Sequence, residues 1–200
     1  MAAKNRDLHG SVPDASRIAL VIIDMINDLE FDGGDRLLKP ALRAARAIAA
    51  LKRKARKHGI PVIYANDNFG RWRSDFRQTV AHCLDEDVRG RPLAELLLPE
   101  PQDYFVLKAK HSAFYWTTLE LLLYYLKAER VVLTGITGDM CVLLTAADAF
   151  MRDLKIYTPA DCIASISATE NTNALQYMKR VLHADTRPSR ELNLARLKRR

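Results

Sequence analysis

Apolar and polar positions form two kinds of segment that alternate along most of the chain. Short continuous apolar runs closed by polar residues are typical of strands buried on both faces of a parallel sheet, and the clearest is IALVIID at 18–24. Longer segments with an apolar residue every three or four positions predict helices covering that sheet. The pattern therefore predicts an α/β fold with helices on both sides. The expected strands are 18–24, 61–66, 103–108, 130–135 and 154–160, with a short sixth strand in 184–188.

Helical patterns fill the intervals between most of these strands. The first helix is rich in Ala, Leu, Arg and Lys, has Pro40 in its first turn and stops at Gly59. The interval 67–102 is mostly polar and contains three prolines, so we expect a loop with one short helix over the sheet edge. The remaining helices are expected in 116–129, 141–153 and 167–184.

A chain of 200 residues with 48% hydrophobic composition suits one domain with a full core. We expect a polar N-terminal extension at 1–15, the domain itself at 16–186, and a basic C-terminal tail at 187–200. No apolar run approaches the roughly 20 residues that cross a bilayer, and the first residues lack the apolar middle of a secretory signal. The expectation is a cytoplasmic protein without membrane contact.

The net charge of +7 and pI of about 9.4 raise the question of an acidic partner. The positive residues are spread over a helix face at 52–57, over Arg71 and Arg73, and over the C-terminal tail. This distribution favours solvated surfaces over a recognition element, so no nucleic-acid partner is expected. An anionic substrate or an acidic partner is left open.

The three cysteines, Cys83, Cys141 and Cys162, are odd in number, far apart and without CxxC spacing. This arrangement argues against a disulfide framework and against a structural zinc site. Free thiols are therefore expected, and one of them can be reactive.

Ligands of open parallel sheets bind beyond the carboxyl ends of the strands. At those ends the first strand delivers Asp24, the second Asn66 and Asp67, and the third Lys108. The fourth delivers a short turn and then Cys141 at the start of a helix. An acid, a lysine and a thiol are thus expected at one edge of the sheet.

These three residue types together can cleave an acyl bond. The helix N-terminus and Lys108 are expected to favour the thiolate of Cys141. Asp24 can take the thiol proton and return it to a leaving amine. Backbone amides around Thr137 and Cys141 can hold the oxyanion of a tetrahedral intermediate.

Three segments carry a resemblance to the isochorismatase-like cysteine hydrolases, a family related to nicotinamidase and N-carbamoylsarcosine amidohydrolase. They are IALVIIDMINDLE, then VLKAKHSAF, and then VVLTGITGDMCVLLTAADAFMRDLKIYTPADCIAS, and the resemblance spans about residues 16–186. It implies a three-layer α/β/α fold with a six-stranded parallel sheet of order 3-2-1-4-5-6, and the triad Asp24, Lys108 and Cys141. It also implies a cis peptide at Ile136–Thr137 that aims the Thr137 amide into the oxyanion hole, and a homo-oligomer, commonly a dimer or tetramer.

The chain departs from the family pattern at two positions. Nicotinamidases of the family carry a metal-binding Asp-x-His after the second strand, where this chain has Asp67-Asn68-Phe69, and His82 is the only later histidine in that loop. No metal and no other cofactor are therefore expected. The usual Gln after the acid is Ile26, which affects a minor contact.

The segment 66–76, NDNFGRWRSDF, carries the expected substrate contacts. Asn68, Phe69 and Trp72 are the candidates for one wall of a small pocket. Arg71 or Arg73 can meet a carboxylate. An equally weighted alternative is that Trp72 and Phe76 pin the loop to the core.

The leading hypothesis is a metal-independent amidohydrolase acting on a small amide, carbamoyl or ureido compound through a thioester. Family members that cleave the vinyl ether of isochorismate lack the cysteine, so its presence favours attack on a carbonyl. The alternative is a non-catalytic or isochorismatase-type member that acts as a binding or assembly protein. A serine hydrolase and a nucleotide-dependent oxidoreductase are disfavoured, because the chain has neither GxSxG nor GxGxxG.

Overall fold

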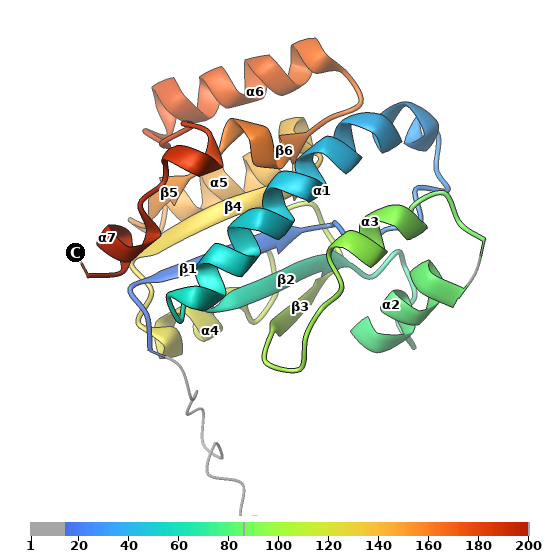
Figure 1. Cartoon of the computed structure of the whole chain (residues 1–200), viewed down its shortest axis with the longest axis horizontal. Coiled ribbons are helices and arrows are strands. Elements are labelled where there is room, and N and C mark those ends of the chain that lie inside the picture. Colours follow the sequence, from blue (N-terminus) through green and yellow to red (C-terminus); the bar gives the residue numbers. More distant parts are fainter. Residues whose placement is uncertain (1–14, 86, 200) are drawn as a thin grey trace, which may run out of the picture.

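A parallel sheet forms the centre of the computed structural model, which describes residues 15–85 and 87–199 (Figure 1). The expected extension at 1–15 lies, apart from Ala15, outside the described residues. The sheet has the order β3-β2-β1-β4-β5, and β6 pairs with β4. The predicted α/β class and the order of the first five strands are confirmed. The strands are β1 (Ile18–Ile23), β2 (Val62–Asp67), β3 (Tyr104–Lys108), β4 (Arg130–Ile136), β5 (Lys155–Tyr157) and β6 (Ile163–Ala164).

Strand β1 shows why the sheet needs helices on both faces. All six of its residues are buried. Because successive side chains point to opposite faces, Leu20 and Ile22 enter one hydrophobic core while Val21 and Ile23 enter the other. Each such side chain stabilises the fold by about 1.5–3 kcal/mol. The central strand therefore ties both helical layers together.

Helices α1, α2, α3 and α7 contribute to the core on one face, and α4, α5 and α6 to the core on the other (Figure 1). Helix α6 begins with a side-chain cap, since the Ser167 hydroxyl accepts a hydrogen bond from the Glu170 amide at 3.2 Å. Within the described residues, no helix combines the length and apolar character that a membrane span needs. The helices are α1 (Gly34–Lys57), α2 (Phe76–Asp85), α3 (Arg91–Leu96), α4 (Leu119–Leu126), α5 (Leu143–Phe150), α6 (Ala168–Val181) and α7 (Leu194–Arg199).

Helix α1 begins earlier than expected, at Gly34, so Pro40 lies in its second turn and not its first. The reason is burial: Leu37 has no exposed surface and continues the apolar stripe of Ala41, Ala44 and Ile48 toward the N-terminus. Packing of this extra turn outweighs the missing amide of the proline.

The interval 67–102 contains two helices, α2 and α3, where the sequence pattern predicted one. Phe76 of α2 stacks on Phe105 of β3 with ring centroids 5.3 Å apart, which fixes the segment over the edge strand. Trp72, by contrast, is 79% exposed. Of the two aromatics expected to pin this loop, only Phe76 does so.

The sixth strand of the sheet is β6, at Ile163–Ala164, while the segment expected as the sixth strand forms only a parallel bridge beside β5. Strand β5 pairs only with Arg130–Val132, which leaves Gly135 and Ile136 of β4 free to pair with β6. In the expected segment 184–188, Asp185 makes a single bridge to Tyr157 of β5. The Thr158 amide donates to the Asp185 carbonyl and the Asp185 amide donates to the Ile156 carbonyl, each at 2.9 Å, so the segment lies beside β5 but pairs with it over a single residue.

The segment expected as a basic tail packs against α1. Leu192 and Leu194 are each only 1% exposed and join the core beneath that helix. Lys54 donates to the Leu192 carbonyl at 2.6 Å, and Lys198 donates to the His58 carbonyl at 2.9 Å. Part of the positive charge therefore serves to hold the C-terminal segment in place.

Candidate active site

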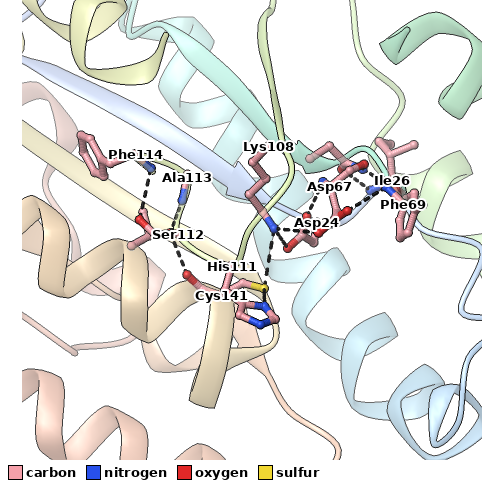
Figure 2. A network of polar contacts seen from close by, with 12 residues as sticks. Asp24, Ile26, Asp67, Phe69, Lys108, His111, Ser112, Ala113, Phe114 and Cys141 are labelled. Carbon is pink, nitrogen blue, oxygen red and sulfur yellow. Dashed lines mark hydrogen bonds and ion pairs between the residues drawn. The ribbon is translucent and has the colours of Figure 1, made fainter. Parts of the chain in front are cut away.

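Asp24 directly follows β1 and has a positive φ of 53°, which turns its carboxylate along the end of the sheet (Figure 2). One oxygen accepts a hydrogen bond from the Asp67 amide at 2.7 Å. The other lies 2.8 Å from the ammonium of Lys108. One carboxylate oxygen is thus fixed by the end of β2 and the other by the end of β3.

Lys108 starts on the edge strand β3 and reaches across β2 to the acid of β1. It is in register with Asp67 at the end of β2, and its Nζ lies 3.5 Å from that carboxylate. The Lys108 side chain has no exposed surface. The Asp67 carboxylate, which lies on β2 between the two strands, therefore stabilises the buried Lys108 ammonium at the place where it meets Asp24.

Cys141 lies in a π-helical turn, Gly138–Val142, which leads into α5. The Ile136–Thr137 peptide bond before this turn is cis. The sulfur of Cys141 is 3.7 Å from Lys108 Nζ and 3.8 Å from His111 Nδ1, and Figure 2 shows it between the two side chains. The structure thus brings the acid, the lysine and the thiol together.

The loop after Lys108 is bound to the helix that follows Cys141. The Ala113 amide donates to the Thr145 hydroxyl at 3.0 Å, and that hydroxyl donates to the Cys141 carbonyl at 2.7 Å. Ser112 also hydrogen-bonds the carboxylate of Asp148. These bonds fix the lysine segment relative to the thiol, and they join residues too distant in sequence to be paired by pattern.

The pKa values of the three groups reflect burial among opposite charges. Burial and the nearby Asp24 raise the pKa of the Cys141 thiol to about 12, although Lys108 and the Thr137 amide oppose this. Burial also raises the pKa of Asp24, against the pull of Lys108. Burial acts to lower the pKa of Lys108, but Asp24, Cys141 and Asp67 together raise it. The expectation of a thiolate favoured by the helix and the lysine is therefore wrong: desolvation and the adjacent carboxylate dominate.

Two contacts were missed by sequence reasoning. His111 follows Lys108 by three residues in the sequence, but its contact with the Cys141 sulfur could not be predicted because it depends on the path of the loop between them. Asn66 accepts from the Ile26 amide at 3.2 Å and donates to the Ile26 carbonyl at 2.8 Å. The loop after Asp24 is thus held through backbone atoms, which leaves the side chain at position 26 free to be apolar and buried.

A cavity of about 510 Å3 opens beside Lys108 at the ends of β2 and β3. Asn68 and Trp72 line it, as does Arg71, whereas Phe69 and Arg73 do not. The Phe69 amide donates to Asp67 at 2.7 Å, so this residue shapes the turn that carries the lining residues.

His82, the later histidine of the same loop, lies 3.0 Å from the carboxylate of Asp28. Within residues 15–85 and 87–199, no three His, Cys, Asp or Glu side chains gather closely enough to hold a metal ion. Asp67, the remaining acid of the family's metal motif, is instead occupied by Lys108 and the Phe69 amide.

The chain is similar in sequence to known proteins and similar in fold to solved structures. The Bacillus subtilis (strain 168) protein YaaI, an uncharacterized isochorismatase family protein, is 44% identical over 167 residues, covering 84% of this chain and 91% of its own. The isochorismatase of the same organism is 29% identical over 170 residues, covering 83% of this chain, which spans about half (54%) of that relative. The crystal structure of N-carbamoylsarcosine amidase from Thermoplasma acidophilum matches with 27% identity and a TM-score of 0.67, over 88% of this chain and 99% of that one.

The isochorismatase domain profile matches residues 18–186, a range that includes every strand of the sheet and all three members of the acid, lysine and thiol group. This chain therefore belongs to the isochorismatase domain family, the isochorismatase-like hydrolases, and has an amidase among its structural neighbours.

Proposed function

We propose that the protein is a cysteine hydrolase that cleaves the C–N bond of a small amide, carbamoyl or ureido compound through a thioester on Cys141. The observation that carries the proposal is the contact of Lys108 Nζ with Asp24 at 2.8 Å and with the Cys141 sulfur at 3.7 Å. Such a group supplies a nucleophile, a base and a fixed positive charge in one buried place. The likeness to N-carbamoylsarcosine amidase supports a C–N bond as the target.

In the first half-reaction the Cys141 sulfur attacks the substrate carbonyl while Asp24 takes the thiol proton. The raised pKa of Asp24 makes it a stronger base than an ordinary aspartate, which suits a thiol that rests in its protonated form. The tetrahedral intermediate then expels nitrogen: the C–N bond breaks and Asp24 returns the proton to the leaving amine. The acyl or carbamoyl group stays on sulfur as a thioester.

In the second half-reaction a water molecule attacks the thioester carbonyl. Asp24 removes a proton from this water, the C–S bond breaks, and the sulfur recovers a proton as the acid product leaves. One carboxylate thus serves both halves of the cycle, and the net change is the addition of water across the C–N bond.

The amides of Thr137 and Cys141 are assigned to the developing oxyanion. The Thr137 amide donates a hydrogen bond to the Cys141 sulfur, which acts to lower the thiol pKa, so this amide is close to the atom to which the carbonyl carbon would be bonded. Such amide donors typically contribute about 3–4 kcal/mol to the transition state. Lys108 stabilises the negative charge that passes between sulfur and carboxylate.

A binding or assembly protein and a vinyl-ether isochorismatase are the competing functions. A binding or assembly protein would not need a thiol placed beside a buried acid and lysine. A vinyl-ether isochorismatase is favoured by the relation to the isochorismatase of Bacillus subtilis. Hydrolysis of a vinyl ether, however, needs no thiol nucleophile, and this site holds one. The arrangement of Asp24, Lys108 and Cys141 therefore favours acyl transfer to sulfur over both alternatives.

The proposal is tested by a turnover screen over small amides and ureido compounds, with acid quench and intact-mass measurement to trap the thioester. Cys141→Ala and Cys141→Ser are expected to abolish turnover and the mass adduct, because a hydroxyl is a much poorer nucleophile without a histidine base. Cys83→Ala, at a buried core position distant in sequence from the site, serves as the control. Turnover that survives Cys141→Ala would refute the proposal.

Metal independence is tested in the same assay with a chelator. We expect full activity after dialysis against EDTA, because Asp67 is engaged by Lys108 and a single carboxylate binds zinc poorly. Loss of turnover that zinc or manganese restores would contradict this part of the proposal.

A further inference from the structure

The cavity beside Lys108 carries uncompensated positive charge. Its charged lining residues are Arg71, Lys108 and Lys110, and no carboxylate lines it. Lys108 is neutralised by Asp24 at 2.8 Å and Asp67 at 3.5 Å. Within the described ranges, neither Arg71 nor Lys110 has a carboxylate within 4.0 Å. The full lining is Asn68, Arg71, Trp72, Ser74, Leu107, Lys108, Ala109, Lys110, Tyr115 and Trp116.

Burial acts to raise the pKa of Asp28, but hydrogen bonds from the Glu30 amide and His82 lower it, and the charge of Arg71 adds a smaller lowering. Asp28 already pairs with His82 at 3.0 Å and accepts from the Glu30 amide at 3.0 Å. Its hydrogen-bonding capacity is thus used by other groups, and within the described residues it forms no ion pair with the Arg71 guanidinium, on which it acts only from a distance.

A hydrogen-bonded turn formed by Asn68, Phe69 and Gly70 fixes the position of the Arg71 backbone beside the cavity. The Gly70 amide donates to the Asn68 side chain at 3.0 Å, and the Arg71 amide donates to the Asn68 carbonyl at 2.9 Å. Phe69 and Gly70 both have positive φ, 50° and 70°, so the chain folds back on itself just before the arginine. The position of the Arg71 backbone thus follows from the turn that ends β2.

Exposed aromatic rings stand around the same opening. Trp116 is 94% exposed and Trp72 79%, and Tyr115 stacks on Trp116 with centroids 6.0 Å apart. Apolar walls around a bound anion exclude water and strengthen its attraction to nearby cations. In the described part of the chain, the opening thus combines two cations that form no ion pair with exposed aromatic rings that a bound ligand would cover.

We infer that the substrate carries an anionic group, a carboxylate in the simplest case, which Arg71 and Lys110 bind at the mouth while its C–N carbonyl is attacked by Cys141. This inference rests on the proposed function. Arginine offers the paired donors that match a carboxylate, and the lysine adds a point charge. A neutral amide would leave both charges unpaired, so ureido or acylamino acids are favoured over simple amides.

The first test uses two thiol reagents of similar size, anionic iodoacetate and neutral iodoacetamide, on the intact protein. We expect Arg71→Gln and Lys110→Gln each to slow alkylation of Cys141 by iodoacetate several-fold, and the double variant more, without changing the rate with iodoacetamide. High salt should reduce the difference. Arg77→Gln, which removes an exposed charge of α2 outside the cavity lining, is the matched control.

The inference is overturned if the ratio of the two alkylation rates stays the same in Arg71→Gln and Lys110→Gln, or falls equally in Arg77→Gln. A second measurement compares kcat/KM for N-carbamoylglycine and for its neutral amide. Preference for the neutral compound would also overturn it while leaving the cysteine mechanism intact. Failure of both reagents to label Cys141 even above pH 9, where its alkylation is expected to accelerate, would instead count against the proposed function itself.

Discussion

Two buried lysines, Lys52 and Lys108, lie in ion clusters of similar composition, but the pKa of Lys52 is lowered and that of Lys108 is raised. In the α1 ion cluster (Lys52, Arg56, Tyr64 and Asp103), Lys52 donates to the Tyr64 hydroxyl at 2.7 Å and to the Leu98 carbonyl at 2.9 Å, and pairs with Asp103 at 2.9 Å. All three of its N–H bonds therefore have short partners. Burial lowers the pKa of Lys52, and Asp103 does not fully restore it.

In the thiol cluster (Asp24, Asp67, Lys108 and Cys141), Lys108 has only one short partner, Asp24 at 2.8 Å. Its other contacts, to Asp67 and the Cys141 sulfur, are 3.5 and 3.7 Å long. The pKa of Lys108 is raised, because three groups that are or can become negative surround it. The difference teaches that an ammonium with three short hydrogen bonds has a structural role. An ammonium with one short and two long contacts, beside a cavity, can serve a reaction.

The largest expected difference between the clusters is in turnover. Lys108→Met and Asp24→Asn are each expected to lower kcat by at least about a hundredfold, because they remove the charge or the base that the attacking thiol needs. Lys52→Met, a matched change at the other lysine, should leave kcat per folded molecule close to that of the wild type. Near wild-type turnover in Lys108→Met would make Lys110 the next lysine to test.

The free energy of unfolding is expected to depend more on the α1 ion cluster than on the thiol cluster. Asp103→Asn removes the carboxylate that Lys52 and Arg56 share, and is expected to lower the free energy of unfolding by about 3 kcal/mol or more. Asp24→Asn should lower it less, since Lys108 keeps Asp67 and borders a cavity. Urea denaturation followed by circular dichroism compares the two, and an equal loss would remove the distinction between the clusters.

The smallest expected effect is a shift in the pH dependence of Cys141 alkylation. A thiol with a pKa of about 12 gains reactivity as pH rises, so the wild-type rate should still climb above pH 9, where a free cysteine levels off near its pKa of about 8.5. Asp24 raises this pKa and Lys108 lowers it, so Asp24→Asn should move the profile to lower pH and Lys108→Met to higher pH. Iodoacetamide rates by mass spectrometry measure both shifts. Asp103→Asn should leave the profile in place, and a shift of the same sign in all three variants would contradict the assigned charges.

The sequence by itself determined the fold class and the edge of the sheet where chemistry occurs. Continuous apolar runs such as residues 18–23 require burial on both faces, and parallel strands bring their carboxyl ends to one edge. Asp24 and Lys108 were predictable there because each ends an expected strand, and Cys141 because it follows the short turn after one. The pattern was less informative for 67–102 and 184–188, where tertiary packing by Phe76 and pairing with β5 over a single residue decided the elements.

Only the tertiary structure decided how these groups act on one another. That Lys108 reaches across β2 by way of Asp67, that His111 approaches the sulfur, and that Arg71 and not Arg73 lines the cavity depend on loop paths with no periodic signal. The sign of the thiol's pKa shift was predicted wrongly for the same reason. Helix position and a nearby lysine can be seen in a sequence, but desolvation depends on every atom packed around the sulfur, and here burial and Asp24 outweigh both.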